Sequence, residues 1–249
     1  MEQLENKASE EEKQLEKYEK PISEHFQELR KRLLIFMAVL LIVFFGLSSL
    51  YADKLMQLVI APVKARGIEF IYVGLAEALI AELKVCFIAS VIITFPVLLW
   101  QVWSFIKPAL YESEQKCVLI FAAVSIVLFL IGVAFGYGAV FISAITFFVY
   151  VGQSFATPML SISDYVGFLL GFVIPFGLVF EMPIIAYILG RMGLVTAELL
   201  TSLRKYVILA IFIIAAFLTP PDVLSQTLMA LPMLVLYEVG VIVVRMTAK

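Results

Sequence analysis

The chain has 249 residues, of which 63% are hydrophobic and 15% are charged. Soluble domains are about 45–50% apolar and about 25% charged, so a soluble fold of this length could not bury so much apolar surface. The composition argues against a soluble enzyme, a nucleic-acid-binding protein and a disulfide-stabilised secreted scaffold, and it indicates an integral membrane protein. The net charge of −2 is less informative than the places where the charges lie.

The charged residues are concentrated at the N-terminus. Residues 1–32 hold 7 of the 18 Lys and Arg residues and 9 of the 20 Asp and Glu residues. Strongly charged segments with few apolar residues do not build a packed core. We therefore predict that residues 1–21 form a charged cytoplasmic lead, either disordered or loosely helical, and that residues 22–249 form one membrane domain.

Uncharged runs along the rest of the chain predict six membrane spans. A bilayer core of about 30 Å needs about 20 apolar residues of helix, and only helices satisfy their own backbone groups within one segment. The predicted fold is therefore all-α and cupped in shape. Its fifth span is unusually short, because that run covers only about 18 Å, and the sixth is also expected to be short. The runs are Leu33–Tyr51, Val85–Trp103, Val118–Tyr150, Tyr165–Leu189, Val207–Leu218 and Val223–Val244.

Lys and Arg positions predict the orientation of these spans. With the N-terminus inside, the cytoplasmic segments hold 14 of these residues and the outside segments hold three. Positive residues are retained on the cytoplasmic side, so both termini are expected there. The first outside segment, Ala52–Glu82, contains an amphipathic stretch from Lys54 to Pro62 and a second candidate helix over Gly74–Glu82. These two are expected to form an external cap.

One acidic residue lies deep inside a predicted span. Glu181 is in the fourth span, and Pro175 and Pro183 on either side are expected to bend the helix around it. An intramembrane carboxylate usually faces a cavity or a partner, so we predict a polar pocket that opens sideways. The simpler alternative is a protonated Glu181 that is hydrogen-bonded to a neighbouring helix. Glu238, nearer the inner end of the sixth span, is interpreted as structural.

A second acidic position lies at the foot of the first span. Glu28 and Arg32 share one helix face with His25 and Leu29, and Glu114 follows the second span at a similar depth. Two carboxylates at one level could bind two guanidinium groups, because an arginine matches a carboxylate with two bonds and a lysine does not. The alternative is that this basic foot only anchors the span.

Polar residues also flank the turn between the fifth and sixth spans. Asp222 is expected to cap the sixth helix, because a carboxylate before a helix accepts bonds from its first N–H groups. Thr219 ends the fifth span. Gln226 lies one turn inside the sixth span, where a polar side chain is typical of a helix–helix contact within the membrane.

No pattern in the sequence predicts catalysis, a metal site or a cofactor. The two cysteines make no disulfide framework, and the single histidine, His25, lies outside the predicted spans. An intramembrane hydrolase would need a nucleophile with a nearby base, and Ser125 and Ser143 are more simply packing residues. A proton-coupled small-solute transporter that uses Glu181 remains an alternative, although we find no internal repeat.

Four short motifs occur in order from about residue 22 to residue 245. They are His25-x-x-Glu28-Leu29-Arg30-x-Arg32, Pro96-x-x-x-x-Gln101-x-Trp103-x-Phe105-Ile106-x-Pro108-Ala109-Leu110-Tyr111-x-x-Glu114, Phe180-Glu181-x-Pro183 and Leu218-Thr219-Pro220-Pro221-Asp222-Val223-x-Ser225-Gln226. Together they resemble the TatC family, the multi-spanning subunits of the twin-arginine protein translocase. The chain departs from the family at Ser113, where His is frequent, and in its longer acidic lead.

The resemblance implies a core receptor subunit in the bacterial cytoplasmic membrane. Such a subunit binds the twin-arginine signal peptides of folded precursor proteins and scaffolds their export, driven by the proton-motive force, with single-span partners of the TatA and TatB type. Self-association in a larger complex is also implied. By resemblance, Glu28 and Glu114 receive the arginine pair, and Arg30 and Phe105 shape that patch.

The resemblance also assigns roles away from the inner foot. Glu181 becomes the acid of the concave membrane face. Thr219 and Gln226 fall where a partner's membrane helix docks, and Pro62 lies in the outer cap.

Overall fold

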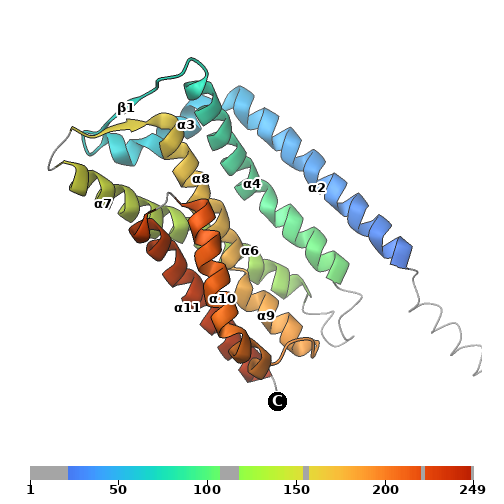
Figure 1. Cartoon of the computed structure of the whole chain (residues 1–249). Helices are drawn as coiled ribbons and strands as arrows, with labels where there is room; N and C mark the ends of the chain where they lie inside the picture. The colour runs from blue at the N-terminus through green and yellow to red at the C-terminus, as the bar shows by residue number, and fades with distance from the viewer. Residues whose placement is uncertain (1–21, 107–117, 154–156, 220–221, 248–249) are drawn as a thin grey trace, which may run out of the picture.

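The computed structural model describes residues 22–106, 118–153, 157–219 and 222–247 (Figure 1). Within these residues, six helical segments are long and apolar enough to cross a membrane, as the uncharged runs predicted. The third contains a π-helical turn and the fourth is broken into two helices. The segments are α2 (Ile22–Leu50), α4 (Glu77–Ile106), α6 (Val118–Phe135) with η2 (Gly136–Phe141) and α7 (Ile142–Gly152), α8 (Ile162–Val179) with α9 (Met182–Arg191), α10 (Ala197–Leu218) and α11 (Val223–Thr247).

The fifth and sixth helices, α10 and α11, are shorter than α2 and α4, but the fifth is much longer than the roughly 18 Å that its uncharged run predicted. Helix α10 has 22 residues and α11 has 25, enough to cross a bilayer core. The uncharged run starts only at Val207, because Arg204 and Lys205 precede it. Helix α10 begins earlier and includes both charged residues. The Arg204 side chain forms an ion pair with Glu238 of α11, with 2.7 Å between Nη2 and Oε2. The structural interpretation of Glu238 agrees with this contact.

The helices pack side by side from one edge of the molecule to the other. Helix α2 lies along α4 at one edge, and α4 in turn packs against α6 and α8 (Figure 1). Helices α9 and α10 pack mainly against α11. Helix α2 is therefore held chiefly along one seam, and most of its surface remains uncovered.

Glycines allow the central helices to approach closely. Gly132 and Gly136 face α8, and a Cβ atom built on Gly132 would lie 2.6 Å from the carbonyl oxygen of Phe176. In the opposite direction, a Cβ on Gly177 of α8 would lie 2.5 Å from the ring of Phe129 in α6. Small residues four apart are a common device for packing membrane helices, because lipid supplies no hydrophobic drive for helix association. This interface fixes the position of α6 relative to α8.

The end of the molecule opposite α9 carries a small capping structure. We define the cap as α3 (Ala52–Lys64), β1 (Glu69–Ile71) and β2 (Met159–Ser161). The two strands pair in parallel, with Glu69 opposite Met159, a feature that the all-α prediction did not include. The amphipathic stretch from Lys54 lies in α3 as expected, whereas Gly74–Glu82 is not a separate helix because α4 begins at Glu77.

Two hydrogen bonds attach the cap to the spans. The Tyr165 hydroxyl of α8 donates to the Val59 carbonyl of α3 at 2.8 Å. The Ser161 hydroxyl of β2 donates to the Glu77 carboxylate at 2.6 Å, at the start of α4. Both bonds join segments that are far apart in the sequence, so the cap ties the ends of several spans together.

Candidate functional site

The foot of α2 holds an ion pair. The Arg32 guanidinium donates from Nη2 and Nε to Oε1 of Glu28, at 2.6 and 3.2 Å. The two residues are four apart, so the helix places them on one face, as predicted. The Glu28 side chain is 36% exposed, which leaves the carboxylate within reach of other groups at the helix foot.

The same arginine joins α2 to α4. Arg32 Nη1 donates to the main-chain carbonyl of Gln101 at 3.3 Å. Phe105 is half-buried and lies one turn beyond Gln101 on α4, so it lies near the ion pair. Glu114 lies outside the described residues, and its position level with Glu28 stays a prediction.

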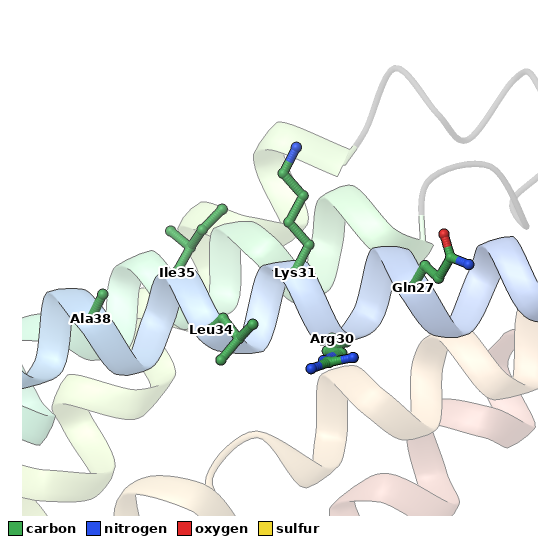
Figure 2. Close-up of a pocket in the computed structure, with 6 residues that line it drawn as sticks. All are labelled: Gln27, Arg30, Lys31, Leu34, Ile35 and Ala38. Carbon is green, nitrogen blue, oxygen red and sulfur yellow. The ribbon is translucent and has the colours of Figure 1, made fainter.

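Arg30 lies on a different face of α2 from Glu28. Two residues along a helix correspond to a rotation of roughly 200°. The Arg30 side chain lines an open depression on the uncovered side of α2, together with Lys31, Leu34 and three further residues (Figure 2). Arg30 is therefore at the depth of Glu28 but does not share its face.

Glu181 lies at the break between α8 and α9, as the flanking prolines suggested. It occupies the N-cap position of α9 and is only 5% exposed. The Ser125 side chain of α6 is a hydrogen-bonding neighbour of the carboxyl group, while Oε1 has no hydrogen-bond partner among the described residues. The carboxyl group is thus enclosed between helices, rather than lining the open pocket that we expected.

Ser125 also links Glu181 to the C-terminal part of α4. The Trp103 indole N–H donates to the Ser125 hydroxyl at 3.3 Å, and all three side chains are buried. Sequence analysis treated Ser125 as a packing residue and did not foresee this connection. The only available signals were an indole near a span end and a hydroxyl in a neighbouring span, which are individually common.

The turn between α10 and α11 is closed by polar side chains. Asp222 accepts a bond from the Ser225 N–H at 2.7 Å, which confirms the predicted cap. The Thr219 hydroxyl donates to the Ala215 carbonyl at 2.9 Å and the residue is buried. Gln226 Nε2 donates to the Phe212 carbonyl of α10 at 3.0 Å, which confirms the predicted helix–helix contact.

The described residues contain no group of three or more His, Cys, Asp and Glu side chains that could hold a metal ion. Two of the predicted site residues in this part of the chain are carboxylates that lie at different depths. Glu28 lies at the foot of α2, and Glu181 lies between the central helices. Their chemistry is the binding of cationic or hydrogen-bonding groups.

Comparisons with known proteins give one consistent result. The family model described as "Sec-independent protein translocase protein (TatC)" matches residues 24–232. The TatC protein of Carboxydothermus hydrogenoformans is 39% identical over 231 residues, covering 91% of this chain and 94% of the relative. That of Desulforapulum autotrophicum is 39% identical over 238 residues, covering 94% and 87%. A crystal structure titled as the twin arginine translocase receptor TatC is 37% identical, with a TM-score of 0.84, and covers 90% of this chain and 100% of its own.

Proposed function

This chain belongs to the TatC family of Sec-independent protein translocase proteins, and we propose that it is the subunit that binds twin-arginine signal peptides. It is a multi-pass membrane protein and a translocase component, not an enzyme. We place it in the bacterial cytoplasmic membrane with both termini in the cytoplasm, because positive residues collect on the side of the N-terminus. The solute-transporter alternative gains no support from the family.

The observation that carries the proposal is the guanidinium held by Glu28. Arg32 occupies this carboxylate through two of its nitrogens, so the site already has the geometry for an arginine side chain. An arginine of an incoming leader would share Glu28 with Arg32 or replace it there. A lysine presents a single point charge and cannot reproduce the two-nitrogen contact.

The rest of the leader site follows from the neighbourhood of Glu28. We propose that Glu114 receives the second arginine. Phe105, half-buried on the last turn of α4, would supply an apolar wall for the residues after the arginine pair. Arg30 contributes positive charge at the same depth and limits where a cationic leader can lie.

Partner binding is proposed at two other places. The exposed apolar side chains Phe217 and Val223, 86% and 81% exposed, flank the turn that Thr219 and Gln226 hold closed. A single-span partner of the TatA or TatB type would pack its helix there. Glu181 would accept a polar group when α8 and α9 move during transport driven by the proton-motive force, and further copies of the chain would complete the complex.

Leader binding can be tested with a fluorescent signal peptide and the full chain in detergent. We expect a peptide with the Arg-Arg pair to bind about tenfold more tightly than its Lys-Lys counterpart, because a charge-assisted bond contributes about 1.5–3 kcal/mol. Glu28→Gln and Glu114→Gln should each remove most of that preference. Glu198→Gln is the matched control, since Glu198 is an exposed carboxylate in the first turn of α10.

Two results would refute this assignment. One is equal affinity for both peptides in the unaltered chain. The other is an Arg-Arg preference that survives the double change at Glu28 and Glu114. Crosslinking from the arginine positions of the peptide to residues 28 and 114 provides an independent measurement of the contact.

A further inference from the structure

The uncovered side of α2 carries an open depression of about 360 Å³. Its six lining residues recur at helical spacing and form one stripe, which we call the α2 stripe. They are Gln27, Arg30, Lys31, Leu34, Ile35 and Ala38 (Figure 2). All six are exposed, so no other described part of the protein covers the stripe.

The two cations of the stripe have no protein partner in the part of the chain that is described. Arg32, one residue further on, is neutralised by Glu28. Arg30 and Lys31 are both exposed and neither forms an ion pair with a described residue. They lie where the apolar span begins, because the membrane-crossing part of α2 starts at Arg30. Basic side chains at the end of an apolar span are expected at the level of the lipid headgroups.

Above the cations the stripe is apolar. Leu34 is 59% exposed and Ile35 is 46% exposed. Figure 2 shows Arg30 and Leu34 along one edge of the stripe and Lys31 and Ile35 along the other. The small side chain of Ala38 follows, eight residues or roughly 12 Å beyond Arg30 along the helix. Each edge of the stripe therefore begins with a cation and continues with an apolar side chain, and the depression lies between the two edges.

We propose that the α2 stripe is a binding site for an anionic phospholipid of the membrane. The headgroup phosphate lies between Arg30 and Lys31, and the upper part of an acyl chain runs between Leu34 and Ile35 onto Ala38. Basic groups at the cytoplasmic membrane surface attract anionic lipids, and the hollow gives this attraction a fixed place.

The charge of the stripe also excludes a different occupant. An arginine-rich leader would be repelled by Arg30 and Lys31, whereas the opposite face of α2 presents the Glu28 carboxylate. The proposal concerns only the uncovered face, and it stands whether or not a leader binds at Glu28.

The site can be tested by native mass spectrometry of the full chain in neutral detergent. The probe is an equimolar mixture of dioleoyl-phosphatidylglycerol and dioleoyl-phosphatidylcholine. Each cation is expected to contribute roughly fivefold to the preference for the anionic lipid, so the double variant R30Q/K31Q should lose about 25-fold of it. The variant K205Q/R245Q removes the same charge from exposed positions on α10 and α11 and should keep the preference.

A second variant separates the hollow from the charge. Ala38→Phe fills the hollow and leaves both cations in place, and we expect severalfold less phosphatidylglycerol to be retained. Unchanged retention in A38F would overturn the proposal, because charge alone would then explain the binding. An equal loss in R30Q/K31Q and K205Q/R245Q would overturn it as well. Circular dichroism and size exclusion of each variant confirm that the fold is kept.

Discussion

The contact of Gly132 with α8 predicts a specific loss of stability. In Gly132→Ala the new Cβ would lie 2.6 Å from the Phe176 carbonyl oxygen and 2.9 Å from Cβ and Cγ of Phe180, well inside the 3.4 Å at which ordinary contact begins. A backbone oxygen cannot rotate away as a flexible side chain can. Helices α6 and α8 must therefore move apart, and overpacking of this kind costs about 1–3 kcal/mol.

The magnitude can be measured against a matched substitution in another span. Gly46→Ala makes the same chemical change in α2, where nothing lies within 4 Å of the new atom. Alanine favours helix over glycine by about 1 kcal/mol, so G46A should melt at or above the temperature of the unaltered chain. G132A gains the same helix propensity, so the overpacking should show as a melting temperature roughly 2–12 °C below that of G46A.

A thiol-reactive dye provides the assay. Cys86 is fully buried, and replacing Cys117, the only other cysteine, by Ser leaves one thiol that reacts when the spans separate. The reasoning would be refuted if G132A melted with or above G46A. We also expect G132A to weaken the approach of Ser125 to Glu181, because α6 carries Ser125 and Glu181 follows α8.

Two further predictions concern single hydrogen bonds between elements. Gln226→Leu removes the donor to the Phe212 carbonyl and should lower the free energy of unfolding by about 0.6–2 kcal/mol, measured by the same dye. Tyr165→Phe removes the donor to the Val59 carbonyl and should cost about 1 kcal/mol, with faster hydrogen exchange in α3 as a second readout.

Each of these predictions has a control on the same kind of side chain. Thr227→Val removes a hydroxyl that bonds only within α11, at 2.6 Å to Val223, and should cost less than Q226L. Tyr206→Phe alters an exposed tyrosine and should leave α3 exchange unchanged. Equal effects of T227V and Q226L, or of Y206F and Y165F, would contradict the assigned bonds.

The spans could be predicted from sequence because lipid tolerates few charges, but the helix ends could not. An uncharged run reports where a helix meets hydrocarbon and not where the helix stops. Helix α10 begins at Ala197 rather than Val207 because the Thr196 hydroxyl caps it by accepting a bond from the Leu199 N–H. Helix α4 begins at Glu77, whose carboxylate accepts bonds from Val73 and Gly74 N–H groups before the first turn.

Local contacts were likewise easier to foresee than distant ones. The Asp222 cap and the Glu28–Arg32 face follow from spacing within one helix, and both are confirmed. That Gln226 makes a helix–helix contact was predicted, but its acceptor on α10 was not. Strands β1 and β2 have three residues each, too few to show an alternating pattern. Strand β1 lies between the first and second spans and β2 between the third and fourth, so their pairing depends on how these four spans pack.

The pairing within the cap has a consequence for the order in which the protein is made. Met159 follows its strand partner Glu69 by 90 positions, so during synthesis from the N-terminus β1 must wait until three spans have been inserted. Once β2 emerges and α8 brings Tyr165 to Val59, that end of the molecule is tied. Helices α10 and α11 then join a body already closed at the cap. This pair, which we propose as the docking place for partner helices, is therefore the last of the six spans to join the membrane body.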